Sequence, residues 1–150
     1  ILVTLHIDYG EESSERIPEL RAIARWMADW AKRSSEWEHN LIALGDFNID
    51  RQGDGLWKAF TSTGLTVPSD LQEVRRTIFS DEKNPHTDKY YDQIAWFEEK
   101  SECPWLSIPY VRSGSFDFLP YVYQDQSLSK QSISYRISDH YPLWVEFSLA

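Results

Sequence analysis

The stretch that decides the fold is Leu41-Ile42-Ala43-Leu44-Gly45-Asp46-Phe47-Asn48, in which an unbroken apolar run ends on a glycine. Such a continuous apolar run is typical of a strand that is buried on both faces. Gly45 allows the backbone to turn or to approach another segment closely. In an extended chain Asp46 and Asn48 face one way while Phe47 faces the other, toward the core. The segment therefore predicts a central strand with polar side chains at its carboxyl end.

The patterning on either side of this strand predicts alternating strands and helices. The other expected strands are residues 1–7, 91–97 and 143–147, with shorter ones near 107–112 and 116–123. Helical periodicity covers residues 15–33, and residues 55–63 form a second, shorter helix, whereas residues 66–90 are polar and loop-like. Strands that alternate with helices and give way to a strand-rich end indicate an α/β domain, a mixed sheet with flanking helices.

Composition limits the class of protein. The 150 residues suffice for one domain and hardly more, and their 41% hydrophobic content, with 7 Trp, 8 Tyr and 7 Phe, predicts a packed core and excludes a disordered chain. The net charge of −9 argues against a broad basic face for nucleic acid, although a local basic patch remains compatible with it. A single cysteine, Cys103, excludes a disulfide or a cysteine-built metal site within these residues and fits a cytoplasmic location. No apolar run approaches the roughly 20 residues of a membrane span.

Four polar motifs lie at the ends of the expected strands. They are His6, the pair Asp46 and Asn48, Asp92, and the pair Asp139 and His140. A carboxylate beside an amide can orient a water molecule, and an imidazole has a pKa near neutrality that suits a general base. A carboxylate next to an imidazole can also select its tautomer.

Each motif has a structural alternative that the residues leave open. Asp46 and Asn48 fit an Asx turn after a strand, and residues 138–142 fit an ordinary surface turn. Asp92 fits a charge at a strand edge, and a lone histidine such as His6 is more often structural than catalytic. The shared position of all four motifs at strand ends favours a site over these alternatives.

In this order, the motifs Val3-Thr4-Leu5-His6, Gly45-Asp46-Phe47-Asn48, Tyr91-Asp92-Gln93-Ile94 and Ser138-Asp139-His140-Tyr141-Pro142 resemble the endonuclease/exonuclease/phosphatase superfamily of metal-dependent phosphoesterases. The resemblance implies hydrolysis of a phosphoester in nucleic acid or in a small phosphorylated molecule, with Mg²⁺ or alternatively Mn²⁺ as cofactor. It covers the C-terminal half of that family's domain, which is half of a four-layer α/β sandwich. Residues 1–150 are therefore expected to be the C-terminal portion of one domain, whose N-terminal half is their partner and carries the principal metal ligand.

The resemblance also implies a role for each motif. His140 is expected to be the general base for the attacking water, and Asp92 to be its orienting carboxylate. Asp46 and Asn48 are expected to position the water and the phosphate oxygens. The two remaining implied roles are a phosphate or leaving-group contact for His6 and a metal ligand, direct or through water, for Asp139.

Two further interpretations stand beside this one. The chain could instead be a non-catalytic fragment or binding module that associates through exposed apolar surface. The basic residues of the loop before Asp92 could border a substrate, but we interpret them as a solvated loop face. They are Arg75, Arg76, Lys83, His86 and Lys89.

Overall fold

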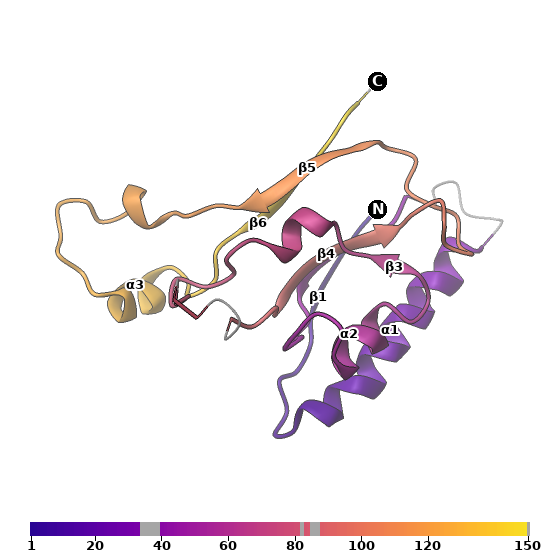
Figure 1. Ribbon diagram of the computed structural model, residues 1–150, viewed down its shortest axis with the longest axis horizontal. Helices are drawn as coiled ribbons and strands as arrows, with labels where there is room; N and C mark the ends of the chain where they lie inside the picture. The colour runs from indigo at the N-terminus through magenta and orange to yellow at the C-terminus, as the bar shows by residue number, and fades with distance from the viewer. Residues whose placement is uncertain (34–39, 82, 85–87, 150) are drawn as a thin grey trace.

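A mixed sheet of four strands forms the centre of the fold, which we describe from a computed structural model for residues 1–33, 40–81, 83–84 and 88–149 (Figure 1). The order of its strands is β1 (Leu2–His6), β2 (Ile42–Asp46), β4 (Asp92–Phe97) and β3 (Leu65–Thr66). β1 runs parallel to β2, whereas β4 is antiparallel to β2 and to β3. β5 (Tyr110–Ser115) and β6 (Leu143–Phe147) pair as a separate antiparallel ribbon.

Two helices and the two-stranded ribbon cover opposite sides of the central sheet. In Figure 1, α1 (Arg16–Ala31) and α2 (Gly55–Phe60) lie together on one side, and β5 and β6 cross on the other. α3 (Lys130–Arg136) lies apart from them, near the far end of the ribbon. Short 3₁₀ turns occur at Ser13–Glu15, Ser69–Gln72 and Leu119–Tyr121. This arrangement confirms the predicted α/β fold, a mixed sheet with flanking helices. Among the described helices, none has both the length and the apolar character needed to cross a membrane.

The period of two along each strand divides its side chains between the two sides. Trp96 of β4 contacts the rings of Tyr110 and Phe147, so its face of the sheet looks toward β5 and β6. Phe47, directly after β2, faces the opposite way: it is fully buried, and its ring lies 4.5 Å from that of Phe60 in α2. Burying a phenylalanine contributes about 1.5–3 kcal/mol. The prediction that Phe47 faces the core is confirmed.

Gly45 is the point of closest approach between β1 and β2. Its φ is +140°, and a Cβ atom there would lie 1.9 Å from the carbonyl oxygen of Leu5. A side chain at this position is incompatible with the parallel pairing that joins His6 to Asp46. The predicted close backbone approach is therefore present, and its partner is the neighbouring strand.

The segment 98–136 differs most from the prediction. One strand, β5, replaces the two expected near 107–112 and 116–123, and the second of these ranges contains the 3₁₀ turn at Leu119–Tyr121. Pro120 lies within that turn and has no N–H to donate to a strand partner. α3 was not predicted, although Ser129 is a regular N-cap whose side chain accepts a hydrogen bond from the Ser132 N–H.

Candidate active site

Strand pairing brings three of the predicted site residues into one row. In the registers of the central sheet, His6 of β1 lies opposite Asp46 of β2, and Asp46 lies opposite Asp92 of β4. Residues opposite each other in register share a face of the sheet. Asp92 lies four residues before Trp96 in β4, and because side chains alternate along a strand, both are on the same face of the sheet. The row therefore lies on the face that looks toward β5 and β6 and away from α1 and α2.

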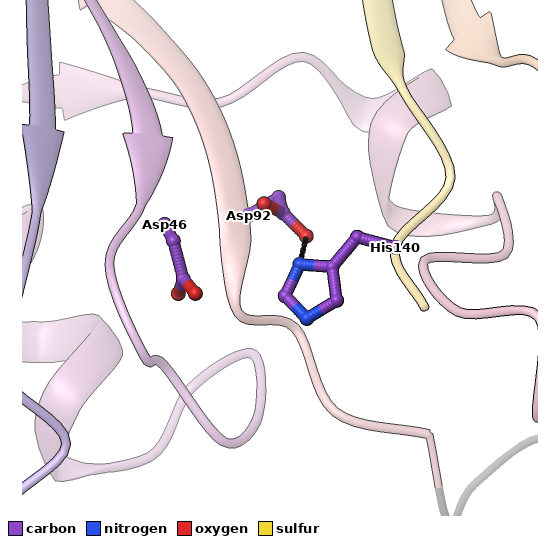
Figure 2. A group of neighbouring side chains, drawn as sticks. All are labelled: Asp46, Asp92 and His140. Carbon is purple, nitrogen blue, oxygen red and sulfur yellow. Dashed lines mark ion pairs between the residues drawn. The ribbon is translucent and has the colours of Figure 1, made fainter. Parts of the chain in front are cut away.

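His140 joins this row from a distant part of the chain. Figure 2 shows its imidazole directed at Asp92, with Nδ1 2.8 Å from Oδ2 of the carboxylate. At the other end of the row, Nε2 of His6 lies 3.8 Å from Oδ2 of Asp46. One ligand atom from each of Asp46, Asp92 and His140 lies within 4.8 Å of the others. Segments that are more than 90 residues apart thus meet in one cluster, which sequence order alone did not require.

Backbone pairing with the loop before β4 holds the segment that carries His140. Thr77 and His140 form an isolated antiparallel bridge, and the Ile78 N–H donates to the Asp139 carbonyl at 2.9 Å. The His140 N–H donates to Oγ of Ser138 at 2.9 Å, which closes a tight turn. His140 therefore sits on a segment whose backbone is fixed on both sides.

The environment of His140 favours its protonated form. Its pKa lies above the ordinary value, chiefly because of the hydrogen bond with Asp92 and further because of the charges of Asp92, Asp139 and Asp46, while burial opposes the rise. The Asp92 carboxylate at Nδ1 places the proton of the neutral imidazole there and leaves Nε2 as the acceptor. The pair has the arrangement of a base and its orienting carboxylate.

Asn48 has a more structural setting than its partner Asp46. Its backbone N–H donates to Oδ1 of Asp46 at 3.0 Å, and its φ of +49° takes the chain out of the strand. Its side-chain amide is buried and donates to the carbonyl of Ile7 at 2.6 Å. The Asx turn and the close placement of Asp46 and Asn48 are both present, and a phosphate contact for Asn48 stays a prediction.

Asp139 lies beside the cluster. Asp139 is exposed, and together with Asp92 and His140 it lines a cavity of about 200 Å³. The possible cation-binding group found among the described residues consists instead of Asp46, Asp92 and His140. Carboxylate oxygens suit Mg²⁺ and Mn²⁺, and an imidazole nitrogen suits Mn²⁺ better than Mg²⁺. The donor set therefore fits a divalent cation, and a ligand role for Asp139 stays a prediction.

A larger cavity of about 460 Å³ is also lined by this pair. Asp92 and His140 contribute to its wall, but most of the lining is apolar. The apolar contributors include Leu44, Ile94, Phe116, Phe118, Val122 and Leu143. His140 and Asp92 thus line both cavities, and the larger of the two is mostly apolar.

Two residues at the site were not predicted from the sequence. The Tyr91 ring stacks on that of His140, with 6.1 Å between ring centres and 26° between planes. Burial and a hydrogen bond with Tyr9 raise the pKa of Tyr91 to about 12, so it is protonated at neutral pH. Arg76 was expected on a solvated loop face, which is wrong, because it is only 2% exposed. The one sequence feature that could have indicated Tyr91 is its position next to Asp92. No feature of the sequence indicated that Arg76 is buried.

The remaining basic residues of that loop differ in position. Lys89 is partly exposed and pairs with Asp50 at 3.0 Å. His86 lies outside the described residues.

Comparisons with known proteins gave one match in sequence and one match in structure at the stated similarities. No family model matches the chain. It is 28% identical over 156 residues to a deoxyribonuclease from Thioalkalivibrio sp. (strain K90mix), an alignment that covers 98% of this chain and 38% of that protein. It shares its fold with the mannosyl-6-phosphatase Bt3783 from Bacteroides thetaiotaomicron VPI-5482, with a TM-score of 0.59, 19% identity, and coverage of 99% of this chain and 51% of that one. The chain thus spans about half or less of each protein it matches.

Proposed function

We propose that this chain forms part of a metal-dependent phosphoester hydrolase of the endonuclease/exonuclease/phosphatase superfamily. The observation that carries the proposal is the row of His6, Asp46 and Asp92 across three strands, completed by His140 at 2.8 Å from Asp92. A deoxyribonuclease and a sugar-phosphate phosphatase both cleave a bond between phosphorus and oxygen, so the two similar proteins support the same class of reaction.

In the proposed reaction, His140 is the general base. Nε2 accepts a proton from water as the water oxygen attacks phosphorus, and the bond from phosphorus to the leaving oxygen breaks. Asp92 holds the imidazole by Nδ1 and stabilises the imidazolium that forms. Asp46 orients the water, and His6, whose side chain is 78% exposed, contacts the phosphate or gives a proton to the leaving oxygen.

A divalent cation fits the same place. The carboxylates of Asp46 and Asp92 are oxygen donors within reach of one position, and Asp139 lines the adjoining cavity. When bound, Mg²⁺ or Mn²⁺ would neutralise charge on the phosphoryl oxygens. The chain's net charge of −9 makes such an added positive charge valuable for an anionic substrate.

The replacement His140→Ala tests the proposal in the intact protein. We expect kcat to fall by about 10²–10⁴-fold, the usual contribution of a general base. The assays are hydrolysis of bis(p-nitrophenyl) phosphate, p-nitrophenyl phosphate and plasmid DNA with Mg²⁺, with EDTA as the metal-free baseline.

Glu146→Gln is the matched control, because it changes an exposed carboxylate that pairs with Arg112 on the ribbon of β5 and β6. Its kcat should equal that of the unmodified protein. Full activity of His140→Ala on every substrate that the unmodified protein cleaves would exclude His140 as the base. Equal activity in EDTA and Mg²⁺ would exclude the metal requirement.

A further inference from the structure

One hydrogen bond does not fix the orientation of the His140 imidazole. The Asp92 carboxylate lies 2.8 Å from Nδ1 and sets the direction of that nitrogen. The ring can still turn about the line from Nδ1 to the carboxylate oxygen, because the torsion that rotates a histidine ring has only broad preferences. Nε2 lies off that line, so turning the ring moves it. A second contact, on the face of the ring, is therefore needed to aim Nε2.

Tyr91 contacts the face of the same imidazole. The centres of the two rings are 6.1 Å apart, and their planes differ by 26°. Aromatic rings attract each other when they are stacked with an offset at centre separations of about 4.5–7 Å. Tyr91 directly precedes Asp92 in the chain. Two consecutive residues therefore contact His140, one at Nδ1 and the other over the ring.

The position of Tyr91 is itself fixed by contacts with other segments. Its carbonyl accepts a hydrogen bond at 2.7 Å from the N–H of Phe47, a fully buried residue. Its ring meets that of Tyr9, in the loop after β1, edge to face, with 6.1 Å between centres and 86° between planes. The guanidinium of Arg16, which is 3% exposed, lies 4.6 Å from the centre of the Tyr9 ring. The ring that contacts His140 thus belongs to a connected set of contacts that reaches α1.

The Tyr91 side chain brings shape rather than charge to His140. Burial and a hydrogen bond with Tyr9 raise the pKa of its phenol to about 12, so the group is neutral at neutral pH. Asp92, by contrast, acts on the imidazole through a hydrogen bond and through its charge. The effects of the two neighbours are therefore separable, and removing the Tyr91 ring should leave the hydrogen bond with Asp92 in place.

We propose that Tyr91, held by Tyr9, is a positioning residue whose ring fixes the plane of the His140 imidazole. This inference rests on the proposed function, because Tyr91 acts only through the imidazole of the proposed base. It goes beyond that function by assigning the aim of Nε2 to a packing contact in addition to the hydrogen bond with Asp92.

The test compares Tyr91→Leu with Tyr91→Phe in the intact protein, measured by kcat and KM. Tyr91→Leu keeps an apolar side chain and removes the flat ring. We expect its kcat to fall about 2–12-fold, the change in rate that corresponds to the strength of one aromatic pair. Its KM should stay within about twofold, because the ring acts on the base and not on substrate binding. Tyr91→Phe keeps the ring, so its kcat should stay close to that of the unmodified protein.

The NMR signals of the His140 ring protons, recorded in EDTA, test the contact without an activity assay. Protons over the face of an aromatic ring resonate upfield of their usual positions. The signals should therefore move downfield in Tyr91→Leu and stay in place in Tyr91→Phe. A general loss of stability does not produce this difference between the two variants.

Tyr121→Leu is the matched control, because Tyr121 is exposed and its ring stacks on that of Phe116 at 5.5 Å and 17°. It loses a stacked pair of the same kind that does not include His140, so kcat and the His140 signals should not change. Melting curves show whether each variant folds. If Tyr91→Leu does not fold, Tyr9→Leu replaces it, since Tyr9 is 51% exposed. Tyr9→Leu should lower kcat about twofold and move the same signals.

An unchanged kcat or unchanged His140 signals in Tyr91→Leu, or in Tyr9→Leu where it replaces that variant, would overturn the inference and leave the proposed function standing. A loss of kcat in Tyr91→Phe as large as that in Tyr91→Leu would also overturn it, because the hydroxyl group and not the ring would then be responsible. If His140→Ala retains full activity, the proposed function itself fails.

Discussion

At the scale of single residues, the two histidines of the site differ in what surrounds them. The side chain of His140 is 28% exposed and held by Asp92, whereas that of His6 is 78% exposed and lies 3.8 Å from Asp46. An imidazole that is hydrogen-bonded to a carboxylate at Nδ1 presents Nε2 as its proton acceptor. An exposed imidazole is available to a ligand from solvent. This contrast supports the proposed division between a base and a phosphate-contacting residue.

The raised pKa of His140 predicts how activity depends on pH. A general base must be neutral, so activity should rise with pH as the His140 imidazole loses its proton, at a pH above its ordinary pKa of about 6.5. Asp92→Asn removes the chief cause of the rise, so the acid limb of the kcat/KM profile should move to lower pH while its plateau falls. NMR titration of the His140 ring in EDTA should show the same lowered pKa.

The raised pKa of His140 also predicts how the stability of the fold depends on pH. Because the folded-state pKa of His140 is raised, its interaction with Asp92 stabilises the fold below the unfolded pKa of about 6.5 and loses this effect as pH rises through the folded pKa.

Glu146→Gln is the control for the pH dependence of activity, and it should change neither the NMR titration of His140 nor the acid limb of the kcat/KM profile. An acid limb that stays in place or moves to higher pH in Asp92→Asn would contradict the prediction.

At the scale of elements, the row of site residues depends on how closely β1 approaches β2. Their registers align His6 with Asp46 only if the backbones meet at Gly45, where Leu5 leaves no space for a Cβ atom. Phe47 then secures the end of β2 against α2. The glycine in the Gly45-Asp46-Phe47-Asn48 motif is therefore a requirement of strand pairing.

Gly45→Ala should destabilise the protein through both its clash and its backbone angle. A positive φ costs about 1–2 kcal/mol for a residue with a side chain, and overpacking adds about 1–3 kcal/mol. Gly53→Ala is the matched control, because Gly53 has a φ of +81° but nothing within 4 Å of the added Cβ. Urea unfolding should therefore show a clearly larger loss for Gly45→Ala, and equal losses would mean that β1 yields to the methyl group.

At the scale of the whole molecule, one carboxylate joins three separate segments of the chain. Asp50 pairs with Arg16 of α1 at 3.1 Å and with Lys89, just before β4, at 3.0 Å. Arg16 is 3% exposed, and its guanidinium also lies over the Tyr9 ring at 4.6 Å. This network ties α1 to the loop after β2 and to the loop before β4.

Asp50→Ala should therefore lower the free energy of unfolding far more than Lys89→Ala does. It leaves the Arg16 charge buried without its carboxylate, a change that costs about 3–5 kcal/mol, whereas Lys89→Ala breaks a partly exposed pair worth about 0–1 kcal/mol. Free energies of unfolding in urea measure both. Similar values for the two variants would show that Arg16 finds another partner when Asp50 is removed.

Much of the fold follows from local pattern. The strands at Leu2–His6, Ile42–Asp46, Asp92–Phe97 and Leu143–Phe147 and the helix at Arg16–Ala31 lie close to the predicted ranges. Long apolar runs and a sustained helical period leave few alternatives for the chain. α3 is short and weakly periodic, with Ile133 as its one buried residue, so its face is defined by packing that the sequence does not show.

The sequence by itself determined the α/β class, the position of the polar motifs at strand ends, and the direction of Phe47, because these depend on spacing along a few residues. Only the tertiary structure decided that His6, Asp46 and Asp92 align across three strands, that His140 meets Asp92, and that Arg76 is buried beside them. Strand register, burial and charge pairing are set by contacts between segments far apart in the chain. Local periodicity does not depend on those contacts, so it could not predict how the residues of the site are arranged.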